Sequence, residues 1–241
     1  MRALVIIPAY NEAANIAAVI GAVRQSFAGP VVVVDDGSND DTGAQARAAG
    51  AIVLCHPCNL GIGAAVQTAF QYAVGHDYDA VVRLDGDGQH DPAYIAGLLE
   101  QLRSGQADVV IGSRFLGREG FQSTLIRRMG IAILTLVSAL VGTRVTDPTS
   151  GYWALNRRAF ALLAHMQADD YPETEALLQA TRAGCRVREI PVIMQPRLIG
   201  RSSIAGVARS GFYMAKVLLA LAVSWLGRRQ IGPTRDRMPR P

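Results

Sequence analysis

The chain has 241 residues, enough for one α/β domain with an appendage or for two small domains. Half of its residues are hydrophobic and 18% are charged, which excludes intrinsic disorder and a collagen-like chain as descriptions of the whole. Three cysteines are too few, and odd in number, for a disulfide framework, so they indicate a reducing compartment.

The net charge of +4 is divided unevenly along the chain. Residues 1–100 carry 4 arginines and 11 acidic residues, a net charge of −7, whereas residues 101–241 carry a net charge of +11. The acidic part is suited to holding a metal ion and the basic part to holding an anion. Because the basic part has no aromatic-rich surface and no recognisable nucleic-acid motif, we expect no nucleic-acid partner.

Short apolar runs alternate with amphipathic segments over the first 111 residues. Residues 3–7 have the composition of a buried strand, and the apolar residues of 16–23 recur at helical spacing. The same alternation predicts strands over 31–34, 51–54, 80–84 and 107–111, and helices over 42–49, 63–74 and 91–102. Continuously apolar strands separated by helices are typical of an α/β fold, whose parallel sheet binds ligands at the carboxyl ends of the strands.

Polar segments follow three of these strands, at residues 8–12, 35–38 and 85–90. In the third segment Asp85 and Asp87 stand two residues apart on a glycine-containing turn. Two carboxylates in this arrangement can face one hard cation and leave positions open for diphosphate oxygens, which is typical of Mg²⁺ or Mn²⁺ sites. One such cluster is ordinary turn chemistry, but three at neighbouring strand ends favour a functional site.

Other motifs do not fit the spacing. A calcium loop starting at Asp85 would need glycine at its sixth position and glutamate at its twelfth, where the chain has His90 and Ala96. Residues 61–66 resemble a dinucleotide fingerprint but lack its third small residue. The four histidines have no obvious partners, so the sequence indicates no Ser-His-Asp or Cys-His site.

Two apolar stretches in the second part of the chain have basic ends. Residues 129–143 follow Arg127 and Arg128, and residues 217–227 lie between Lys216 and Arg228. Neither reaches the ~20 residues needed to span a bilayer. Such stretches are typical of interfacial helices, although two core helices or a dimer interface would have the same pattern. We expect a membrane-associating helix over 204–227 and a disordered basic tail over 228–241.

Seven motifs carry a family resemblance: IIPAYNE, VVVVDDGSNDDT, CNLGIGAAVQTAF, VRLDGDGQHDP, VIGSRF, DPTSGYWALNRRAF and RLIGRSSI. Over about residues 3–227 the chain resembles the family 2 glycosyltransferases of the GT-A fold, specifically the dolichyl-phosphate mannose synthase-like branch, which glycosylates polyprenyl phosphates. The resemblance implies a Rossmann-like, mostly parallel sheet flanked by helices, followed by C-terminal amphipathic or apolar helices. It also implies a catalytic domain over 1–203, with a nucleotide-sugar and metal half (1–112) and an acceptor half (113–203).

Roles for single residues follow from the resemblance. The nucleotide-sugar would be bound by Pro8, Tyr10, Glu12, Asp35, Asp36, Gly63, Asp85, Gly86, Arg197, Arg201 and Ser202. The Mg²⁺ or Mn²⁺ ion and the diphosphate would be held by Asp85, Asp87 and Gln89. The acceptor phosphate would be bound by Ser113, Arg114, Asp147, Ser150 and either Arg127 or Arg128. The catalytic residues would be Asp87, Arg114, Arg127 or Arg128, and Glu175 beside the sugar.

The implied reaction is inverting transfer of a hexose or deoxyhexose from a UDP-, GDP- or dTDP-sugar to an undecaprenyl- or dolichyl-type phosphate, serving cell-envelope glycan or glycoconjugate synthesis. A phosphate that is ionised near pH 7 is its own nucleophile, so no strong base is required. We expect a cytoplasmic enzyme associated peripherally with the cytoplasmic face of the membrane, with a homo-oligomer left open. The alternatives are a family 2 transferase with a saccharide or soluble acceptor and a non-catalytic membrane-associated scaffold.

Overall fold

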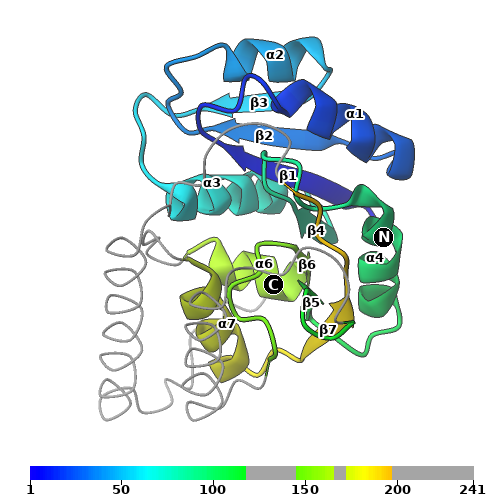
Figure 1. Ribbon diagram of the computed structural model, residues 1–241. Coiled ribbons are helices and arrows are strands. Elements are labelled where there is room, and N and C mark those ends of the chain that lie inside the picture. The colour runs from blue at the N-terminus through cyan, green and yellow to red at the C-terminus, as the bar shows by residue number, and fades with distance from the viewer. Residues whose placement is uncertain (118–144, 166–171, 197–241) are drawn as a thin grey trace, which may run out of the picture. The chain divides into compact units, whose positions relative to one another are not determined.

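The computed structural model describes residues 1–117, 145–165 and 172–196 (Figure 1). By its contacts the chain divides into a unit of Met1–Ser202 and a unit of Ser203–Pro241. The predicted membrane-associating helix at 204–227, the basic tail at 228–241 and the apolar stretch at 129–143 lie outside the described residues. None of the helices in the described ranges is long and apolar enough to cross a membrane.

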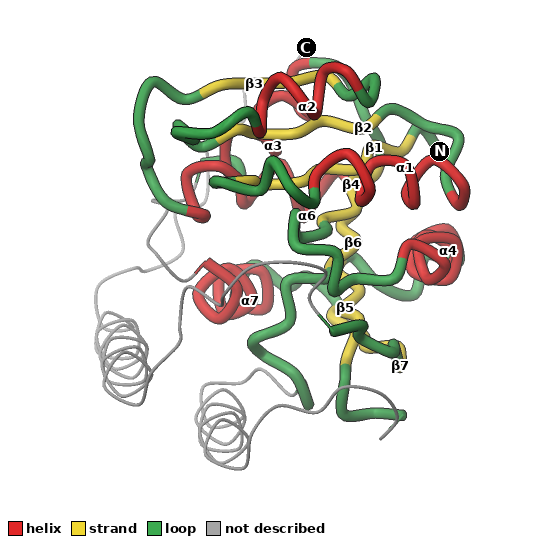
Figure 2. The backbone as a smooth tube through the Cα atoms, turned by 45° about the horizontal axis from the view of Figure 1, so that its top comes forward, coloured by secondary structure: helices red, strands yellow, loops and turns green. Residues whose placement is uncertain are grey.

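Within the described residues, seven strands form one sheet in the order β3-β2-β1-β4-β6-β5-β7 (Figure 2). Neighbouring strands are parallel except for β6, which runs antiparallel to both β4 and β5. The strands are β1 (Ala3–Ala9), β2 (Val31–Asp35), β3 (Ile52–Cys55), β4 (Ala80–Arg83), β5 (Val109–Ser113), β6 (Trp153–Asn156) and β7 (Val187–Pro191). The predicted α/β fold with a mostly parallel sheet is confirmed.

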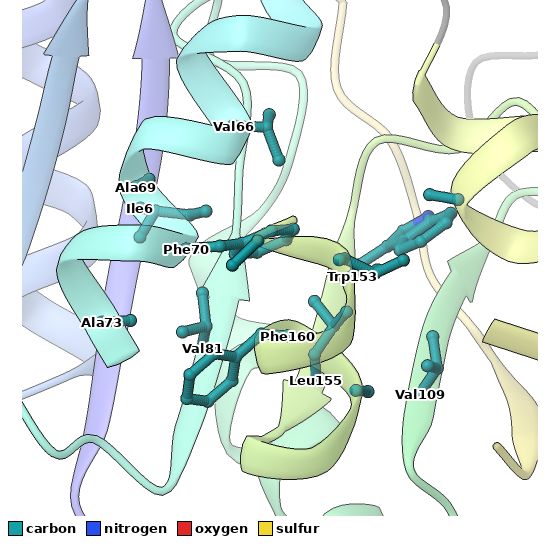
Figure 3. Close-up of a cluster of buried hydrophobic side chains, with 14 of the residues drawn as sticks. Ile6, Val66, Ala69, Phe70, Ala73, Val81, Val109, Trp153, Leu155 and Phe160 are labelled. Atoms are coloured by element: carbon teal, nitrogen blue, oxygen red, sulfur yellow. The ribbon is translucent and has the colours of Figure 1, made fainter. Parts of the chain in front are cut away.

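Helices cover both faces of the sheet because successive side chains of a strand point to opposite sides. In β1, Leu4 and Ile6 belong to one core and Val5 and Ile7 to the other. The first core takes its helical side chains from α3 (Ile62–Gly75), α6 (Arg157–Leu163) and α7 (Pro172–Arg182), and the second from α1 (Ile16–Ser26), α2 (Thr42–Ala48) and α4 (Ile95–Arg103). In the first core Phe70 stacks on Phe160, with ring centroids 6.4 Å apart (Figure 3).

The five predicted strands are present, each with small shifts at its ends. The fifth, β5, runs to Ser113 rather than ending at Ile111, so Arg114 follows directly on a strand end. The helix predicted from Asp91 begins as a single 3₁₀ turn (Pro92–Tyr94), in which the Asp91 side chain accepts a hydrogen bond from the backbone N–H of Ala93. Strands β6 and β7 are not predicted from the sequence.

The strand order reverses at β1, which pairs with β2 on one side and with β4 on the other. In open α/β sheets the carboxyl ends of the strands at such a reversal form the crevice in which ligands bind. Ala9 at the end of β1 lies opposite Asp35 of β2, and Ile6 lies opposite Arg83 of β4. The three polar segments predicted from the sequence therefore follow adjacent strands at one edge of the sheet.

Candidate active site

The loop after β1 is hydrogen bonded to the loop after β2. The backbone N–H of Asn11 donates to Ser38 Oγ at 2.9 Å, and that of Glu12 donates to Thr42 Oγ1 at 2.8 Å. The turn after β4 lies against the same loop, since a Cβ added at Gly86 would meet Glu12 Cγ at 3.5 Å. The structure thus brings the predicted nucleotide-sugar residues of these three segments together: buried Pro8 and Asp36, half-buried Glu12, Asp35 and Asp85, buried Gly86, and Tyr10, whose ring is exposed.

Asp36 holds the connection between β3 and α3. The residue is 3% exposed, and its carboxylate accepts hydrogen bonds from the backbone N–H groups of Leu60 and Gly61, both at 2.9 Å. Asp36 Oδ1 also lies 2.7 Å from His56 Nδ1, while His56 Nε2 lies 2.9 Å from Thr68 Oγ1. The sequence-based view that the histidines lack partners is therefore wrong for His56. This carboxylate positions the loop that leads into α3 and into buried Gly63.

The glycine that follows Asp36 is required by close packing. Gly37 has a φ of +67°, and a Cβ added there would meet the carbonyl carbon of Cys58 at 2.3 Å. Only glycine combines that backbone conformation with so close an approach. The DDGS motif is thus explained in part by the packing of the loop after β2 against the loop after β3.

The turn after β4 is held by internal hydrogen bonds and by His90. The backbone N–H of Asp85 donates to His90 Nδ1 at 3.0 Å, and that of Gln89 donates to Asp87 Oδ1 at 3.0 Å. The His90 ring stacks on Tyr152 with centroids 4.9 Å apart. Burial lowers the pKa of His90, so the neutral imidazole accepts the Asp85 amide at Nδ1. His90 is a second histidine whose partners the sequence does not indicate.

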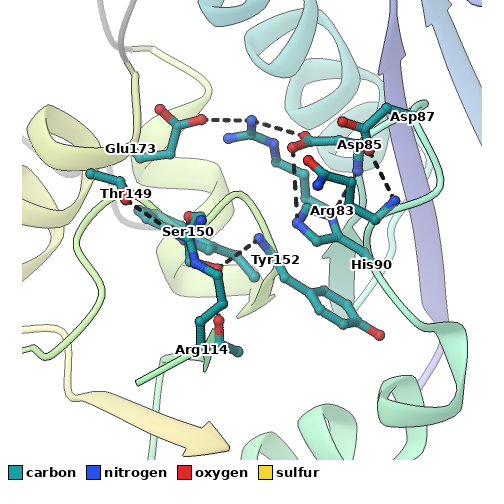
Figure 4. A network of polar contacts seen from close by, with 12 residues as sticks. Arg83, Asp85, Asp87, His90, Arg114, Thr149, Ser150, Tyr152 and Glu173 are labelled. Carbon is teal, nitrogen blue, oxygen red and sulfur yellow. Dashed lines mark hydrogen bonds and ion pairs between the residues drawn. The ribbon is translucent and has the colours of Figure 1, made fainter. Parts of the chain in front are cut away.

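Arg83 is the last residue of β4, the strand that leads to this turn. Its Nη2 donates to Glu173 Oε1 of α7 at 2.6 Å and to Asp85 Oδ1 at 3.3 Å (Figure 4). Burial lowers the pKa of the Arg83 guanidinium, but the charges of Glu173 and Asp85 outweigh burial and the pKa is raised. Glu173 is a site residue that sequence reasoning missed, whereas predicted Glu175 lies half-buried on the same helix.

The segment 145–152 forms the other side of the site. The Arg114 guanidinium donates from Nε to Asp147 Oδ2 and from Nη2 to Asp147 Oδ1, each at 2.7 Å, and also from Nη2 to Thr149 at 2.9 Å. Asp147 is fully buried, and its backbone N–H donates to Glu189 Oε1 of β7 at 3.0 Å. Ser113 hydrogen bonds to Thr146 at 2.7 Å, and Ser150 donates to the carbonyl of Gly112 at 2.7 Å. The four predicted acceptor residues in the described ranges are thus assembled around one segment.

Gly151 joins this segment to the turn after β4. A Cβ added at Gly151 would meet Asp85 Oδ2 at 2.8 Å and Arg83 Nη2 at 3.3 Å. The segment 194–195 reaches the same turn, because Gln195 N–H donates to the Gln89 carbonyl at 2.9 Å. The remaining predicted site residues, namely Arg127, Arg128, Arg197, Arg201 and Ser202, lie outside the described residues.

A sequence profile described as Glycosyl transferase family 2 matches residues 4–163 of the chain. The chain is 32% identical over 241 residues to the undecaprenyl-phosphate mannosyltransferase of Micrococcus luteus, covering 95% of this chain and 98% of that protein. It is 30% identical over 217 residues to the polyprenol monophosphomannose synthase of Mycolicibacterium smegmatis, covering 85% and 82%.

Among solved structures, the chain is similar to a glucosyl-3-phosphoglycerate synthase from Mycobacterium tuberculosis in complex with Mn²⁺, UDP-glucose and phosphoglyceric acid. The TM-score is 0.72 at 23% identity, with 96% of this chain and 81% of that chain covered. At this identity the likeness shows the fold, and it confirms the predicted GT-A architecture.

Proposed function

The chain belongs to glycosyl transferase family 2, and on that premise we propose that it transfers a hexose or deoxyhexose, with inversion, from a nucleotide-sugar to a polyprenyl phosphate. Relatives about 30% identical are named for mannosyl transfer to polyprenyl phosphates, which supports this choice of acceptor. The observation that carries the proposal is the contact of Gly151 with Asp85. It supports the proposal because the segment 145–152, whose Asp147 is bound to Arg114, lies against the turn that we assign to the donor.

The donor side is built from the loops after β1, β2 and β4. We assign the nucleoside to residues 8–12 and 35–36, whose loops are bound to one another through Ser38 and Thr42. Asp36 acts there through the loop that it holds. Arg197, Arg201 and Ser202 are proposed to reach the diphosphate, and this fits the anchoring of Gln195 on the turn after β4.

The side chains of the turn after β4 have the chemistry to bind Mg²⁺ or Mn²⁺ as a cofactor. Asp85 and Asp87 offer carboxylate oxygens and Gln89 offers an amide oxygen, which are the hard ligands that these ions prefer. Within the described residues no three His, Cys, Asp or Glu side chains are arranged to hold a metal, so we assign the remaining ligands to the diphosphate. When bound, the ion would neutralise charge on the leaving nucleoside diphosphate.

On the acceptor side, the chain needs to bind and orient an ionised phosphate rather than to remove a proton. Asp147 holds the Arg114 guanidinium by two hydrogen bonds, which fixes its plane. We propose that Arg114, with Arg127 or Arg128, binds the lipid phosphate in line with the bond that breaks, and that Glu175 lies beside the sugar. Holding two reactants in line is itself a large part of catalysis.

Membrane association is part of the proposal, because a polyprenyl phosphate is embedded in a bilayer. The stretches 129–143 and 204–227 are the proposed contacts with the cytoplasmic membrane surface, and the basic residues at their ends are suited to anionic headgroups. A peripheral enzyme at that surface would meet its acceptor there and its nucleotide-sugar in the cytoplasm.

The proposal is tested by incubating the purified chain with Mn²⁺ or Mg²⁺, a panel of UDP-, GDP- and dTDP-sugars and a short polyprenyl phosphate, then analysing the lipid fraction by mass spectrometry. The expected product is a polyprenyl phosphate carrying one hexose or deoxyhexose, formed with one of the donors and lost with EDTA. Release of nucleoside diphosphate with no lipid product would overturn the acceptor assignment and favour the saccharide or soluble acceptor considered from the sequence.

A further inference from the structure

Arg83 is a buried cation in the strand β4, which leads to the proposed metal-binding turn. The residue is 3% exposed, in a strand whose other residues are all apolar. Its Nε atom is buried and has no hydrogen-bond partner among the described residues. A buried guanidinium with an unsatisfied nitrogen is costly, and apolar residues would form the strand without that cost. This cost suggests that Arg83 does something that an apolar side chain would not do.

One atom of Arg83 is shared by two carboxylates from distant parts of the chain. Nη2 lies 2.6 Å from Glu173 Oε1 and 3.3 Å from Asp85 Oδ1 (Figure 4). Glu173 is the less exposed partner, with its side chain 14% exposed against 32% for Asp85. The ion pair of Arg83 with Glu173 is therefore stronger than its ion pair with Asp85. Solvent also screens the contact with Asp85 more strongly.

We propose that Arg83 tunes the affinity of Asp85 for the divalent cation, and that Glu173 sets the strength of this effect by competing for the same guanidinium nitrogen. The inference rests on the metal-assisted transfer proposed above. A fixed positive charge 3.3 Å from a carboxylate opposes the binding of a second cation to that carboxylate. The negative charge of a diphosphate offsets the opposition, so the metal binds chiefly together with the nucleotide. Arg83 and Glu173 are positioning residues in this scheme.

The two partners of the ion pair should then have opposite effects. In Arg83→Gln the opposing charge is gone, so nucleotide-free Mn²⁺ binds more tightly. In Glu173→Gln the competing carboxylate is gone, so Arg83 interacts more strongly with Asp85 and Mn²⁺ binds more weakly. If the ion pair only maintained the fold, removing either partner would disturb the turn, and both variants would change the Mn²⁺ affinity in the same direction. Arg83→Lys keeps the charge and should stay close to the wild type.

The experiment measures free Mn²⁺ by electron paramagnetic resonance during titration of the full chain, first with Mn²⁺ alone and then with UDP or GDP present. We expect the Mn²⁺ dissociation constant without nucleotide to fall about tenfold in Arg83→Gln and to rise several-fold in Glu173→Gln, with smaller changes when the nucleotide is bound. The matched controls are Arg103→Gln and Glu100→Gln, which break an exposed ion pair on α4 at 3.6 Å and should change nothing. Thermal melting identifies any variant that fails to fold.

Shifts of the same sign in the two variants, or no shift in either, would overturn the inference. If Arg83→Gln does not fold, Glu173→Gln alone still tests the inference. Unchanged or tighter Mn²⁺ binding by Glu173→Gln would contradict the proposed competition. A wild-type chain that binds no Mn²⁺ even with UDP or GDP would overturn the proposed metal assistance as well. A wild-type chain that binds Mn²⁺ with nucleotide, while the variants match it, would overturn the role of Arg83 alone.

Discussion

Gly151 lies against the carboxylate of Asp85, so closely that a Cβ at Gly151 would stand 2.8 Å from Asp85 Oδ2. The two residues are far apart in the sequence and come from the two halves of the proposed site. The absence of a side chain at position 151 lets the segment 145–152, which we propose binds the acceptor, approach the turn after β4. Single changes at this contact and around it therefore test the proposed function.

Gly151→Ala should displace the Asp85 carboxylate and lower the transfer rate by about tenfold or more, since small misplacements of reacting groups are costly. The rate is read from nucleoside diphosphate release in the presence of polyprenyl phosphate. Gly21→Ala is the matched control, because nothing lies within 4 Å of a Cβ added there in α1, and it should leave the rate unchanged. Equal rates for the two variants would show that the Gly151 contact has no part in catalysis.

Asp87→Ala should remove a metal ligand and reduce turnover about 100-fold or more, which corresponds to ~3 kcal/mol of lost transition-state stabilisation. Initial rates at saturating Mn²⁺ provide the measurement. Asp77→Asn serves as the control, because Asp77 forms only an exposed pair with Arg157 among the described residues. Near-wild-type turnover in Asp87→Ala would refute its assignment to the metal.

Arg114→Lys should keep the positive charge but lose the two parallel hydrogen bonds to Asp147. We expect KM for polyprenyl phosphate to rise about tenfold, with the binding of Mn²⁺ and nucleotide unchanged. Steady-state kinetics with varied lipid measures the first quantity and titration measures the second. A change in nucleotide binding with an unchanged KM for the lipid would assign Arg114 to the donor site instead of the acceptor site.

Asp108 offers a test of stability far from the proposed chemistry. Burial opposes its ionisation, but hydrogen bonds from Arg186 and Asn156 outweigh burial and lower the pKa from 3.8 to about 2. Because the folded-state pKa lies below the unfolded value, the stabilisation is complete above about pH 4 and is lost as the pH falls towards 2. Asp108→Asn should therefore cost about 1 to 2 kcal/mol of unfolding free energy at pH 7.

Urea denaturation of the wild type and of Asp108→Asn at pH 7 and pH 3 measures this difference. The difference in unfolding free energy between the two proteins should be smaller at pH 3, because the ionised Asp108 of the wild type then stabilises the folded state less. A gap that stays constant or widens at the lower pH would contradict the assigned pKa direction.

Membrane association is tested by flotation with vesicles that contain anionic phospholipid. The full chain should float with the vesicles at low salt, less at high salt, and less again when residues 204–241 are removed, because basic residues near the surface are attracted to anionic lipid. Vesicles of neutral phospholipid provide the control. If the chain does not float with the anionic vesicles at low salt, the proposed peripheral association with the membrane is contradicted.

The first half of the fold could be predicted from the sequence because its signals are local. β-Branched runs such as Val31–Val34 favour buried strands. The polar residues after each run lie at the same edge of the sheet by the geometry of parallel strands. The sequence therefore predicts that residues 8–12, 35–38 and 85–90 lie together. The motifs at these positions carry the resemblance to the family.

The second half could not be predicted in the same way because its contacts are long in sequence. Strand β6 is inserted antiparallel between β4 and β5, and nothing in residues 153–156 specifies those two partners. Glu173 of the second half meets Arg83 across 90 residues. A non-local contact escaped prediction in the first half too, since His56 after β3 lies beside Asp36 after β2. For the first of these contacts the sequence offers only an arginine in an otherwise apolar strand, and this pattern does not identify Glu173 as its partner.

The proposed acceptor is tested most directly by comparing nucleoside diphosphate release with three mixtures: polyprenyl phosphate, the same polyprenol without its phosphate, and no acceptor. Each mixture contains the full chain, Mn²⁺ and the donor sugar selected from the panel. We predict rapid release with polyprenyl phosphate and only slow background hydrolysis in the other two. Equal release in all three would contradict the claim that the lipid phosphate is the nucleophile in this site.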